Sequence, residues 1–250
     1  MEISHATASA PGRLNEDYVA AGADWAIVLD GATAPTGVNT GCIHTVRWLV
    51  KHLASAVSSR LFLSDEATLS DLLAESITET CNAHSDTCDL TNPDSPSSTI
   101  SIVRTRDTSL DYLTLGDSPI VLWHRNESYT PIADDRTSHL PGGRPYTIEL
   151  ERAYRNRSGG FWVASTKPEA AYQALCGSAP LADISEVGLF TDGITRLLEW
   201  YGYTWPEIFS SLRSEGPTSL ITLVRAAERE QPHPYEKRHD DATAVCLALP

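Results

Sequence analysis

Short apolar runs bounded by turn-forming residues recur along this chain, and they limit it to folds built from short strands. The runs are rich in Val, Ile, Leu and aromatic residues, which is typical of strands. They are residues 24–29, 99–104, 109–115, 120–124, 160–164, 187–191 and 243–248. Because several are separated by gaps of hairpin length, they favour a mostly antiparallel sheet over a doubly wound parallel one.

An apolar stripe with helical spacing lies between the first two runs. It begins near Thr40 and consists of Ile43, Val46, Val50, Leu53 and Val57. A second helix is expected after Ser64, a candidate N-cap with Asp65 and Glu66 in the positive first turn. Its expected buried residues are Leu69, Leu72, Leu73 and Ile77. We expect these two helices to pair, because each apolar face needs a sheet or another helix to cover it.

Three more helices are expected in the second half of the chain. One follows Ser165 or Thr166, with Pro168 near its first turn and Gly177 at its end. The other two lie near residues 194–200 and 217–228. This order of elements predicts an α+β sandwich in which helices cover sheets. The stretch TNPDSPSS, residues 91–98, is expected to be a loop inside one domain, so that residues 1–250 form a single domain.

The chain is acidic, with 33 Asp and Glu against 19 Lys and Arg and a net charge of −14. This charge repels a phosphate backbone, so we expect no nucleic-acid partner. No apolar stretch approaches the roughly 18 residues of a membrane-spanning helix. The N-terminal residues also lack the basic start and apolar centre of a signal peptide. We therefore expect a cytoplasmic protein that does not bind membranes.

The chain has five scattered cysteines and no CxxC pair. They are Cys42, Cys81, Cys88, Cys176 and Cys246. An odd number with such spacing predicts neither a disulfide framework nor a zinc site, and we interpret these residues as reduced, mostly buried thiols. His84 lies between Cys81 and Cys88, and we interpret these three as part of a helix end with small residues rather than as metal ligands.

Acidic residues stand where the expected strands begin or end. They are Asp30, Asp117, Asp192, Asp240 and Asp241, joined by Glu16 and Asp17 ahead of the first strand. If the strands are neighbours, these acids meet at one edge, where each raises the pKa of the next unless a cation is present. Oxygen ligands of this kind favour Mg²⁺ or Mn²⁺ over Zn²⁺. The alternative is that Asp-Gly and Gly-Asp simply form turns, since both pairs are common there.

Six short motifs in a fixed order decide between these interpretations. They are NED, LDGAT, SSTISIV, LGDSPIVLW, LFTDGI and DDATAVCLAL. From about Asn15 to Leu249 this order resembles the type 2C family of metal-dependent serine/threonine protein phosphatases, in its compact bacterial form. The resemblance implies a central β-sandwich of two mostly antiparallel sheets flanked by helices, with a binuclear metal centre at one end. Its cofactors are Mn²⁺ or Mg²⁺, as two ions and in some bacterial relatives a third.

The resemblance also implies roles for single residues. Asp30 matches the carboxylate that bridges two metal ions, and the carbonyl group of Gly31 matches a ligand of one of them. Glu16 matches an acid on the side of that same ion. Asp17 matches a residue that holds metal-bound water.

Asp192 and Asp240 resemble the ligands of the second ion. Between the adjacent acids Asp240 and Asp241 we choose Asp240, because the sequence that follows it fits the family motif better. Either one could be the ligand on sequence alone. Asp117 resembles the acid that helps to bind a third, weaker ion.

The motifs also depart from the family pattern. An arginine that binds substrate phosphate usually lies four residues before the glutamate, whereas Arg13 lies three before Glu16. Arg13 is therefore either the phosphate-binding residue or a surface arginine. The family's Gly-His-Gly-Gly is replaced by residues 32–37, ATAPTG. His44 is either a general acid or a histidine on a helix surface, so protonation of the leaving group stays unassigned.

Residues 134–157 contain five arginines in an otherwise acidic chain. The resemblance places a flap beside the metal site within residues 134–185, where some of these arginines would meet a phosphopeptide. The alternative is a solvated loop.

Our first hypothesis is a cytoplasmic, monomeric phosphatase that removes phosphate from protein serine or threonine. By resemblance, a metal-bound hydroxide attacks phosphorus directly, without a covalent enzyme intermediate. No cysteine has the Gly-rich and Arg context of a Cys-based phosphatase. The alternatives are a catalytically inactive module that binds a phosphorylated partner, and a small-molecule phosphomonoesterase.

Overall fold

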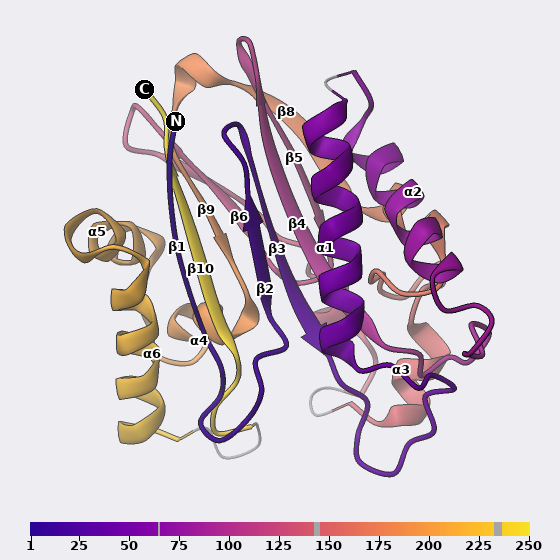
Figure 1. Cartoon of the computed structure of the whole chain (residues 1–250). Helices are drawn as coiled ribbons and strands as arrows, with labels where there is room; N and C mark the ends of the chain where they lie inside the picture. Colours follow the sequence, from indigo (N-terminus) through magenta and orange to yellow (C-terminus); the bar gives the residue numbers. More distant parts are fainter. Residues whose placement is uncertain (65, 143–145, 233–236) are drawn as a thin grey trace.

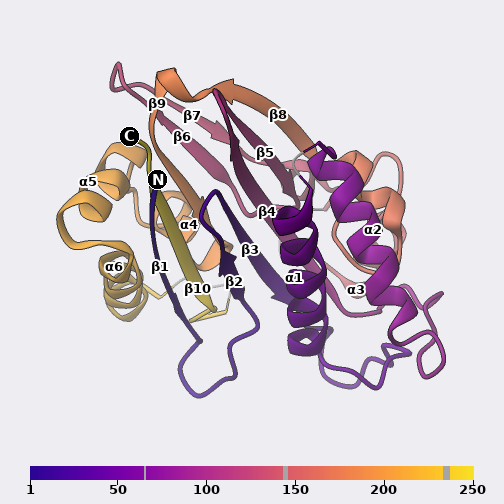
Figure 2. The same cartoon turned by 45° about the horizontal axis from the view of Figure 1, so that its top comes forward.

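Two five-stranded sheets lie face to face between layers of helices in the computed structural model (Figures 1 and 2). The structure describes residues 1–64, 66–142, 146–232 and 237–250. A core of small and branched residues fills the space between the sheets, including Val28, Val103, Leu189 and Val245. The predicted α+β sandwich is therefore confirmed. Among the described residues, no helix has the length and apolar character needed to cross a membrane.

The first sheet carries the strands that lead to the first Asp-Gly pair. Its order is β2 (Tyr18–Ala21), β3 (Trp25–Ala32), β4 (Ser97–Arg106), β5 (Ser109–Leu115) and β8 (Leu175–Pro180). Every neighbouring pair is antiparallel. Side chains on β3 alternate between two buried surfaces, with Ile27 and Leu29 facing the helices and Ala26 and Val28 facing the second sheet. Burial on both faces explains why this strand is an unbroken apolar run.

The second sheet contains the first and last strands of the chain and the strand that leads to the second Asp-Gly pair. Its order is β1 (Glu2–Ala8), β10 (Ala242–Ala248), β9 (Ile184–Phe190), β6 (Ile120–His124) and β7 (Tyr129–Ile132). All of these pairs are antiparallel as well. Because β1 pairs with β10 along its full length, the N- and C-termini lie together at one end of the sandwich (Figure 1).

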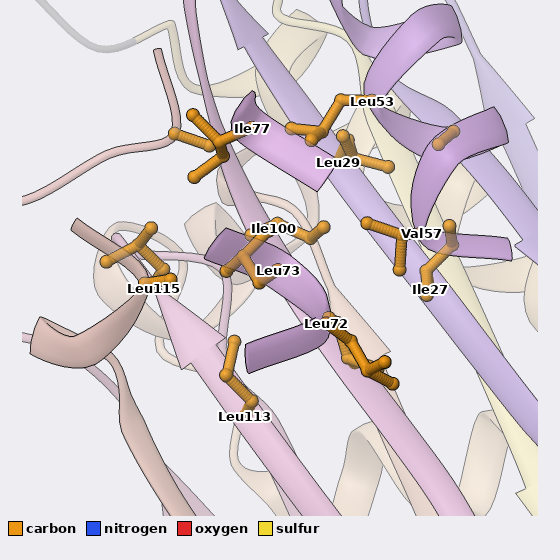
Figure 3. Packing of buried hydrophobic residues seen from close by; sticks show 14 of the residues in the cluster. Ile27, Leu29, Leu53, Val57, Leu72, Leu73, Ile77, Ile100, Leu113 and Leu115 are labelled. Carbon is orange, nitrogen blue, oxygen red and sulfur yellow. The ribbon is translucent and has the colours of Figure 1, made fainter. Parts of the chain in front are cut away.

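Two helices cover the outer face of the first sheet. These are α1 (Val46–Leu63) and α2 (Leu69–Asn82), and their side chains interlock with those of β3, β4 and β5 (Figure 3). The pairing of the two helices is confirmed, and so are their predicted apolar faces except for Ile43. The second sheet is covered by α4 (Asp192–Glu199), α5 (Trp205–Glu215) and α6 (Pro217–Glu230), which form their own apolar cluster with it.

The starts of the first two helices differ from the prediction. The stripe expected from Thr40 becomes helical only at Val46, because the Thr45 side chain accepts the backbone N–H of Trp48 and caps the helix. Ile43 consequently lies outside the helix and is 74% exposed. Ser64 ends α1 instead of starting α2, whose N-cap is Thr68. The predicted first-turn residue Asp65 lies outside the described residues.

Other predicted elements also change type. The helix expected between Ser165 and Gly177 is a short 3₁₀ helix, Pro168–Gln173, followed by β8. Gly177 lies inside that strand, where a Cβ atom would sit 2.3 Å from the Tyr112 hydroxyl oxygen. The strand expected at residues 160–164 is absent from the described structure, and only isolated bridges occur there, at Phe161 and Ala164.

Several elements were not predicted. They are β1, β2, β7 and β8, with the helices α3 (Ile148–Tyr154) and α5. Strands β1, β2, β7 and β8 all lie at sheet edges. Polar residues interrupt the apolar pattern of β1, β7 and β8, which are largely exposed, whereas β2 has only four residues and most of them are half-buried. Pro131 within β7 is typical of an edge strand.

Candidate functional site

An acidic pocket of about 350 Å³ is lined by residues where β3 and β9 end. This end of the sandwich lies opposite the two termini (Figure 1). Antiparallel pairing brings the ends of β3, β5 and β9 to this edge, together with the starts of β2, β4, β6 and β10. The predicted site residues that line it are Asp30, Gly31, Asp117, Asp192 and Asp240. The expectation that acids at strand ends would converge is met by these residues.

Close packing, and not a turn, explains the two Asp-Gly pairs. Asp30 and Gly31 lie within β3, where a Cβ atom on Gly31 would be 2.3 Å from Cγ1 of Val46. Asp192 and Gly193 are the first residues of α4. A Cβ atom on Gly193 would lie 1.8 Å from the carbonyl oxygen of Asp241. The turn alternative is therefore wrong for both pairs.

Asp117 does occupy a connection between two strands. It lies between β5 and β6, after Gly116, whose φ of +88° favours glycine. The hydroxyl group of Thr137 is 3.4 Å from one of its carboxylate oxygens. The turn places the Asp117 side chain on the pocket wall, so Asp117 both belongs to the turn and lines the candidate site.

Asp17 is buried next to these acids, with 5% of its surface exposed. One carboxylate oxygen, Oδ2, accepts hydrogen bonds from Thr191 at 2.9 Å and Thr243 at 2.6 Å. The other, Oδ1, has no hydrogen-bond partner within the described parts of the chain. Burial raises the pKa of Asp17 to about 8 despite those two hydrogen bonds, and the charges of Asp192 and Asp241 add to the rise. A buried carboxylate oxygen without a partner indicates a place for a cation or a water molecule.

The same repulsion acts on the acids of the pocket itself. Burial, followed by the charges of Asp192 and Asp17, raises the pKa of Asp30 well above its ordinary value. Burial, followed by the charges of Asp240 and Asp117, raises the pKa of Asp192 to about 7. Without a cation these carboxyl groups cannot all be ionised at neutral pH. The all-oxygen donor set therefore fits a hard divalent cation.

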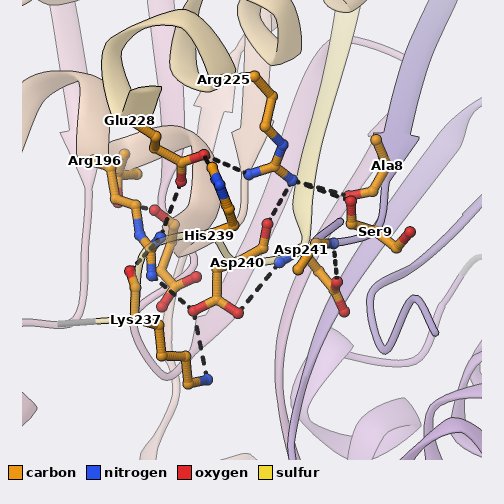
Figure 4. Close-up of polar contacts among 12 residues, drawn as sticks. Ala8, Ser9, Arg196, Arg225, Glu228, Lys237, His239, Asp240 and Asp241 are labelled. Carbon is orange, nitrogen blue, oxygen red and sulfur yellow. Dashed lines mark hydrogen bonds and ion pairs between the residues drawn. The ribbon is translucent and has the colours of Figure 1, made fainter. Parts of the chain in front are cut away.

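Asp240 is held by a network of basic side chains around Glu228 (Figure 4). Arg196 donates to Oδ2 of Asp240 at 2.8 Å and to the carboxylate of Glu228 at 3.0 Å. Glu228 is completely buried and also accepts from Arg225 at 2.9 Å and His239 at 2.6 Å. Since Glu228 shares Arg196, the charge of Asp240 is only partly neutralised.

The neighbouring acid, Asp241, has a different environment. Its Oδ1 accepts the backbone N–H of Ala10 at 2.7 Å, and its Oδ2 accepts that of Glu16 at 2.6 Å. Asp240 lines the pocket, whereas Asp241 fixes the segment that precedes β2. This difference favours Asp240 over Asp241 as the acid that faces a cation.

Glu16 and Arg13 lie outside the pocket lining formed by the described residues. Both oxygens of Glu16 accept the hydroxyl group of Thr33, at 2.6 and 2.7 Å. Its backbone oxygen nevertheless lies beside Gly31, 2.7 Å from where a Cβ atom would be. Arg13 is exposed, and its backbone N–H donates to the oxygen of Ala10. The structure brings Glu16 next to the acids but does not bring Arg13 there.

Arg155 is a candidate that the sequence did not single out from the other arginines. It follows α3, lines the pocket, and has a side chain that is 18% exposed. Within the described ranges its terminal nitrogens make only long contacts, 3.4 Å to the oxygen of Pro93 and 3.5 Å to Glu151. Its Nε is buried without a hydrogen-bond partner among the described residues, and burial lowers its pKa. The guanidinium group is therefore available to an anion in the pocket.

The remaining arginines of the segment 134–157 have other environments. Arg136 pairs with Asp134, Arg152 binds Asp94 at 2.7 Å, and Arg157 is exposed. Arg144 lies outside the described residues.

The family model of protein phosphatase 2C matches residues 5–225, which is most of the chain but stops short of Asp240. Among curated proteins, no sequence matches the chain.

Three solved structures illustrate the similarity in fold. The serine/threonine phosphatase PstP/Ppp of Mycobacterium tuberculosis is 18% identical, with a TM-score of 0.66 and coverage of 99% of this chain and 98% of that one. Stp1 of Staphylococcus aureus is 16% identical, with a TM-score of 0.68 and coverage of 100% and 95%. The catalytic domain of PstP in complex with two manganese ions is 17% identical, with a TM-score of 0.61 and coverage of 99% and 97%.

Proposed function

The chain belongs to the protein phosphatase 2C family, and from this we propose that it hydrolyses phosphoserine and phosphothreonine in proteins. The reaction takes place in the acidic pocket at the end of the sandwich. The observation that carries the proposal is the convergence of Asp30, Asp192 and Asp240 in one pocket, beside a buried Asp17 whose Oδ1 has no partner among the described residues. A monomeric state, a cytoplasmic location and a flap within residues 134–185 stay predictions from the sequence.

The residues present fit two Mn²⁺ or Mg²⁺ ions. By resemblance to the family, Asp30 would hold both ions, the carbonyl group of Gly31 and the carboxylate of Glu16 would hold one of them, and Asp192 and Asp240 would hold the other. Raised pKa values of Asp30 and Asp192 support this, because bound cations favour the ionised form of both. When bound, such ions polarise the phosphoryl oxygens and lower the pKa of water. Asp117 would serve a third ion.

Asp17 has a separate role in this proposal. Thr191 and Thr243 fix its position through Oδ2, and Oδ1 remains as an acceptor. We assign to that oxygen the task of holding and orienting the attacking water. The two threonines also connect Asp17 to the segment before Asp192 and to β10. The position of Oδ1 is therefore fixed relative to Asp192 and Asp240.

Arg155 is the residue to which we assign the substrate phosphate. A guanidinium group can donate two parallel hydrogen bonds to phosphate oxygens, which fixes the orientation of the phosphoryl group. Arg155 lines the acidic pocket and has no short contact with the residues that the structure describes, whereas Arg13 is exposed outside the pocket. Lys237 also lines the pocket and pairs with Asp240 at 3.5 Å, so it can add positive charge near the phosphate.

The test is hydrolysis of a phosphothreonine peptide and of an aryl phosphate with Mn²⁺, with Mg²⁺ and with a chelator. Activity should require the metal and should vanish in Asp30→Asn and Asp192→Asn. Arg155→Ala should raise the KM for the peptide more than Arg13→Ala does, because only Arg155 lies in the pocket. Folded protein without activity in any metal would refute the proposal and leave a phosphoprotein-binding module. A clear preference for the aryl phosphate would refute the protein substrate alone.

A further inference from the structure

Two cysteines and a histidine meet at a second place in the molecule. The sulfur atoms of Cys42 and Cys88 are 3.1 Å apart. Nδ1 of His44 lies 3.7 Å from the sulfur of Cys42 and 3.4 Å from that of Cys88. Among the described residues, this is the one group of three metal-ligating side chains whose ligand atoms all lie within 4.8 Å of one another. The grouping was not expected from the sequence, in which Cys42 and Cys88 are 46 residues apart.

We propose that Cys42, His44 and Cys88 bind a thiophilic divalent metal ion, and that zinc is the ion they suit best. A tetrahedral zinc site has Zn–S distances of about 2.3 Å and Zn–N distances of about 2.0–2.1 Å. Its ligand atoms are therefore separated by about 3.6–3.8 Å. The two nitrogen–sulfur distances already match this spacing, and the sulfur atoms need to separate by only about 0.6 Å.

Neighbouring residues hold the histidine in place for this role. The ring of His44 stacks on Trp48 with centroids 4.1 Å apart, and His84 meets it edge-on at 5.7 Å. The backbone N–H of His44 donates to the sulfur of Cys42 at 3.4 Å. These ring contacts accompany an orientation of His44 in which Nδ1 faces both sulfur atoms.

The two segments that supply the cysteines are already bound to each other. The backbone N–H of Asp89 donates to the oxygen of Gly41 at 2.8 Å. The side chain of Asn92 donates to the oxygen of Asn39 at 3.0 Å. These bonds lie directly beside the cysteines, so the ligands are brought together without an ion. A metal would then need little rearrangement to bind.

This site is separate in place and chemistry from the acidic pocket. None of its three residues is among the described residues that line the pocket. Thiolate and imidazole ligands select zinc and similar metals, whereas the carboxylates of the pocket select Mg²⁺ or Mn²⁺. All three ligands are half-buried, which leaves a fourth position for water. The bound ion would fasten the loop between β3 and α1, which follows Asp30 and Gly31, to the chain after α2.

Cobalt substitution in the full-length, reduced protein tests the proposal independently of phosphatase activity. Co²⁺ bound by two thiolates gives a sulfur-to-metal charge-transfer absorption in the near ultraviolet, which oxygen ligands do not give. We expect this absorption at one ion per chain in the wild type and in Cys176→Ser, whose thiol is exposed elsewhere. It should be lost in Cys42→Ser and in Cys88→Ser. Asp30→Asn should retain it, which separates this site from the proposed phosphatase centre.

Alkylation of the wild type gives a second readout that needs no variant. Zinc at about ten times its Kd should slow alkylation of Cys42 and Cys88 about tenfold, because only the free protein reacts. Peptide mass spectrometry should show an unchanged rate at Cys176. The proposal would be overturned if zinc left the alkylation rate of each of these two cysteines, Cys42 and Cys88, unchanged. It would also be overturned by a cobalt absorption that survives both serine substitutions.

Discussion

Replacement of Asp192 by Asn should stabilise the metal-free protein while it removes metal-dependent activity. The side chain keeps its shape but loses its charge. Burial, then the charges of Asp240 and Asp117, raises the pKa of Asp192 from 3.8 to about 7. At pH 8 the folded protein therefore holds an ionised carboxylate in an unfavourable place. Asn relieves that repulsion, which at pH 8 is relieved in the wild type by a bound cation.

The size of the gain follows from the pKa. A rise from 3.8 to about 7 corresponds to a cost of about 4 kcal/mol at pH 8. Because the side chain is partly exposed, screening reduces this to about 2 kcal/mol. Asp192 is also the first residue of α4, where its charge contributes about 0.5 kcal/mol that Asn lacks. The net gain is about 1–2 kcal/mol, or a rise in Tm of about 2–8 °C.

The dependence on pH distinguishes this effect from a general improvement in packing. The folded-state pKa is raised, so the contribution of Asp192 to stability is fully present below pH 3.8 and is lost as the pH rises through about 7. The advantage of Asn should therefore be largest at pH 8, less than half as large at pH 5, and absent only below about pH 3.8.

Thermal unfolding in the presence of a chelator, at both pH values, measures the effect. Asp183→Asn is the matched control, because this exposed acid lies just before the start of β9 while Asp192 follows its end. Added Mn²⁺ should raise the Tm of the wild type and of the control but not that of Asp192→Asn. A variant that is less stable than the wild type at pH 8, or equally stabilised at both pH values, would refute the reasoning.

Three further substitutions test other parts of the structure. Glu228→Gln leaves three basic side chains around a neutral group, so urea unfolding should show that the free energy of unfolding falls by about 3–5 kcal/mol. Because Arg196 would then neutralise more of the charge of Asp240, calorimetry should also show weaker Mn²⁺ binding. Gly193→Ala places a methyl group against the carbonyl oxygen of Asp241, so urea unfolding should show that the free energy of unfolding falls by about 1–3 kcal/mol. Leu73→Ala, in the fully buried contact of α2 with the sheet, should cost about 2–5 kcal/mol while kcat per folded molecule is kept. If any of the three variants were as stable as the wild type, the energetic role assigned to its contact would be wrong.

The sequence predicted the central strands well and the edge strands poorly. Strands β5 and β6 have the bounds expected from their apolar runs, because both faces of these segments are largely buried. Strand β1 reads EISHATA, with polar residues that face solvent at the sheet edge. Its pairing with β10 depends on contacts more than 230 residues away in sequence, and no local pattern reveals those.

The acids of the site could be predicted from the sequence, whereas the position of Arg155 could not. Asp30, Asp192 and Asp240 adjoin strand ends, and antiparallel order alone brings such ends together. The position of Arg155 depends on how the segment after β7 folds over the pocket around its own small cluster at Leu140 and Phe161. Five arginines in that segment look alike in the sequence, and only tertiary packing distinguishes them.

The charges around the pocket explain why the fold keeps an arrangement that opposes its own stability. Asp30, Asp117, Asp192 and Asp240 line the pocket together with only two basic side chains that the structure describes there, Arg155 and Lys237. Arg196 reaches Asp240, yet Glu228 holds the same arginine from behind and limits how much charge it neutralises. A hydrophobic or fully paired pocket would be more stable but would have no affinity for a divalent cation. The excess negative charge is therefore the feature that suits this edge of the sandwich to a divalent cation, and the stabilisation expected for Asp192→Asn measures that charge directly.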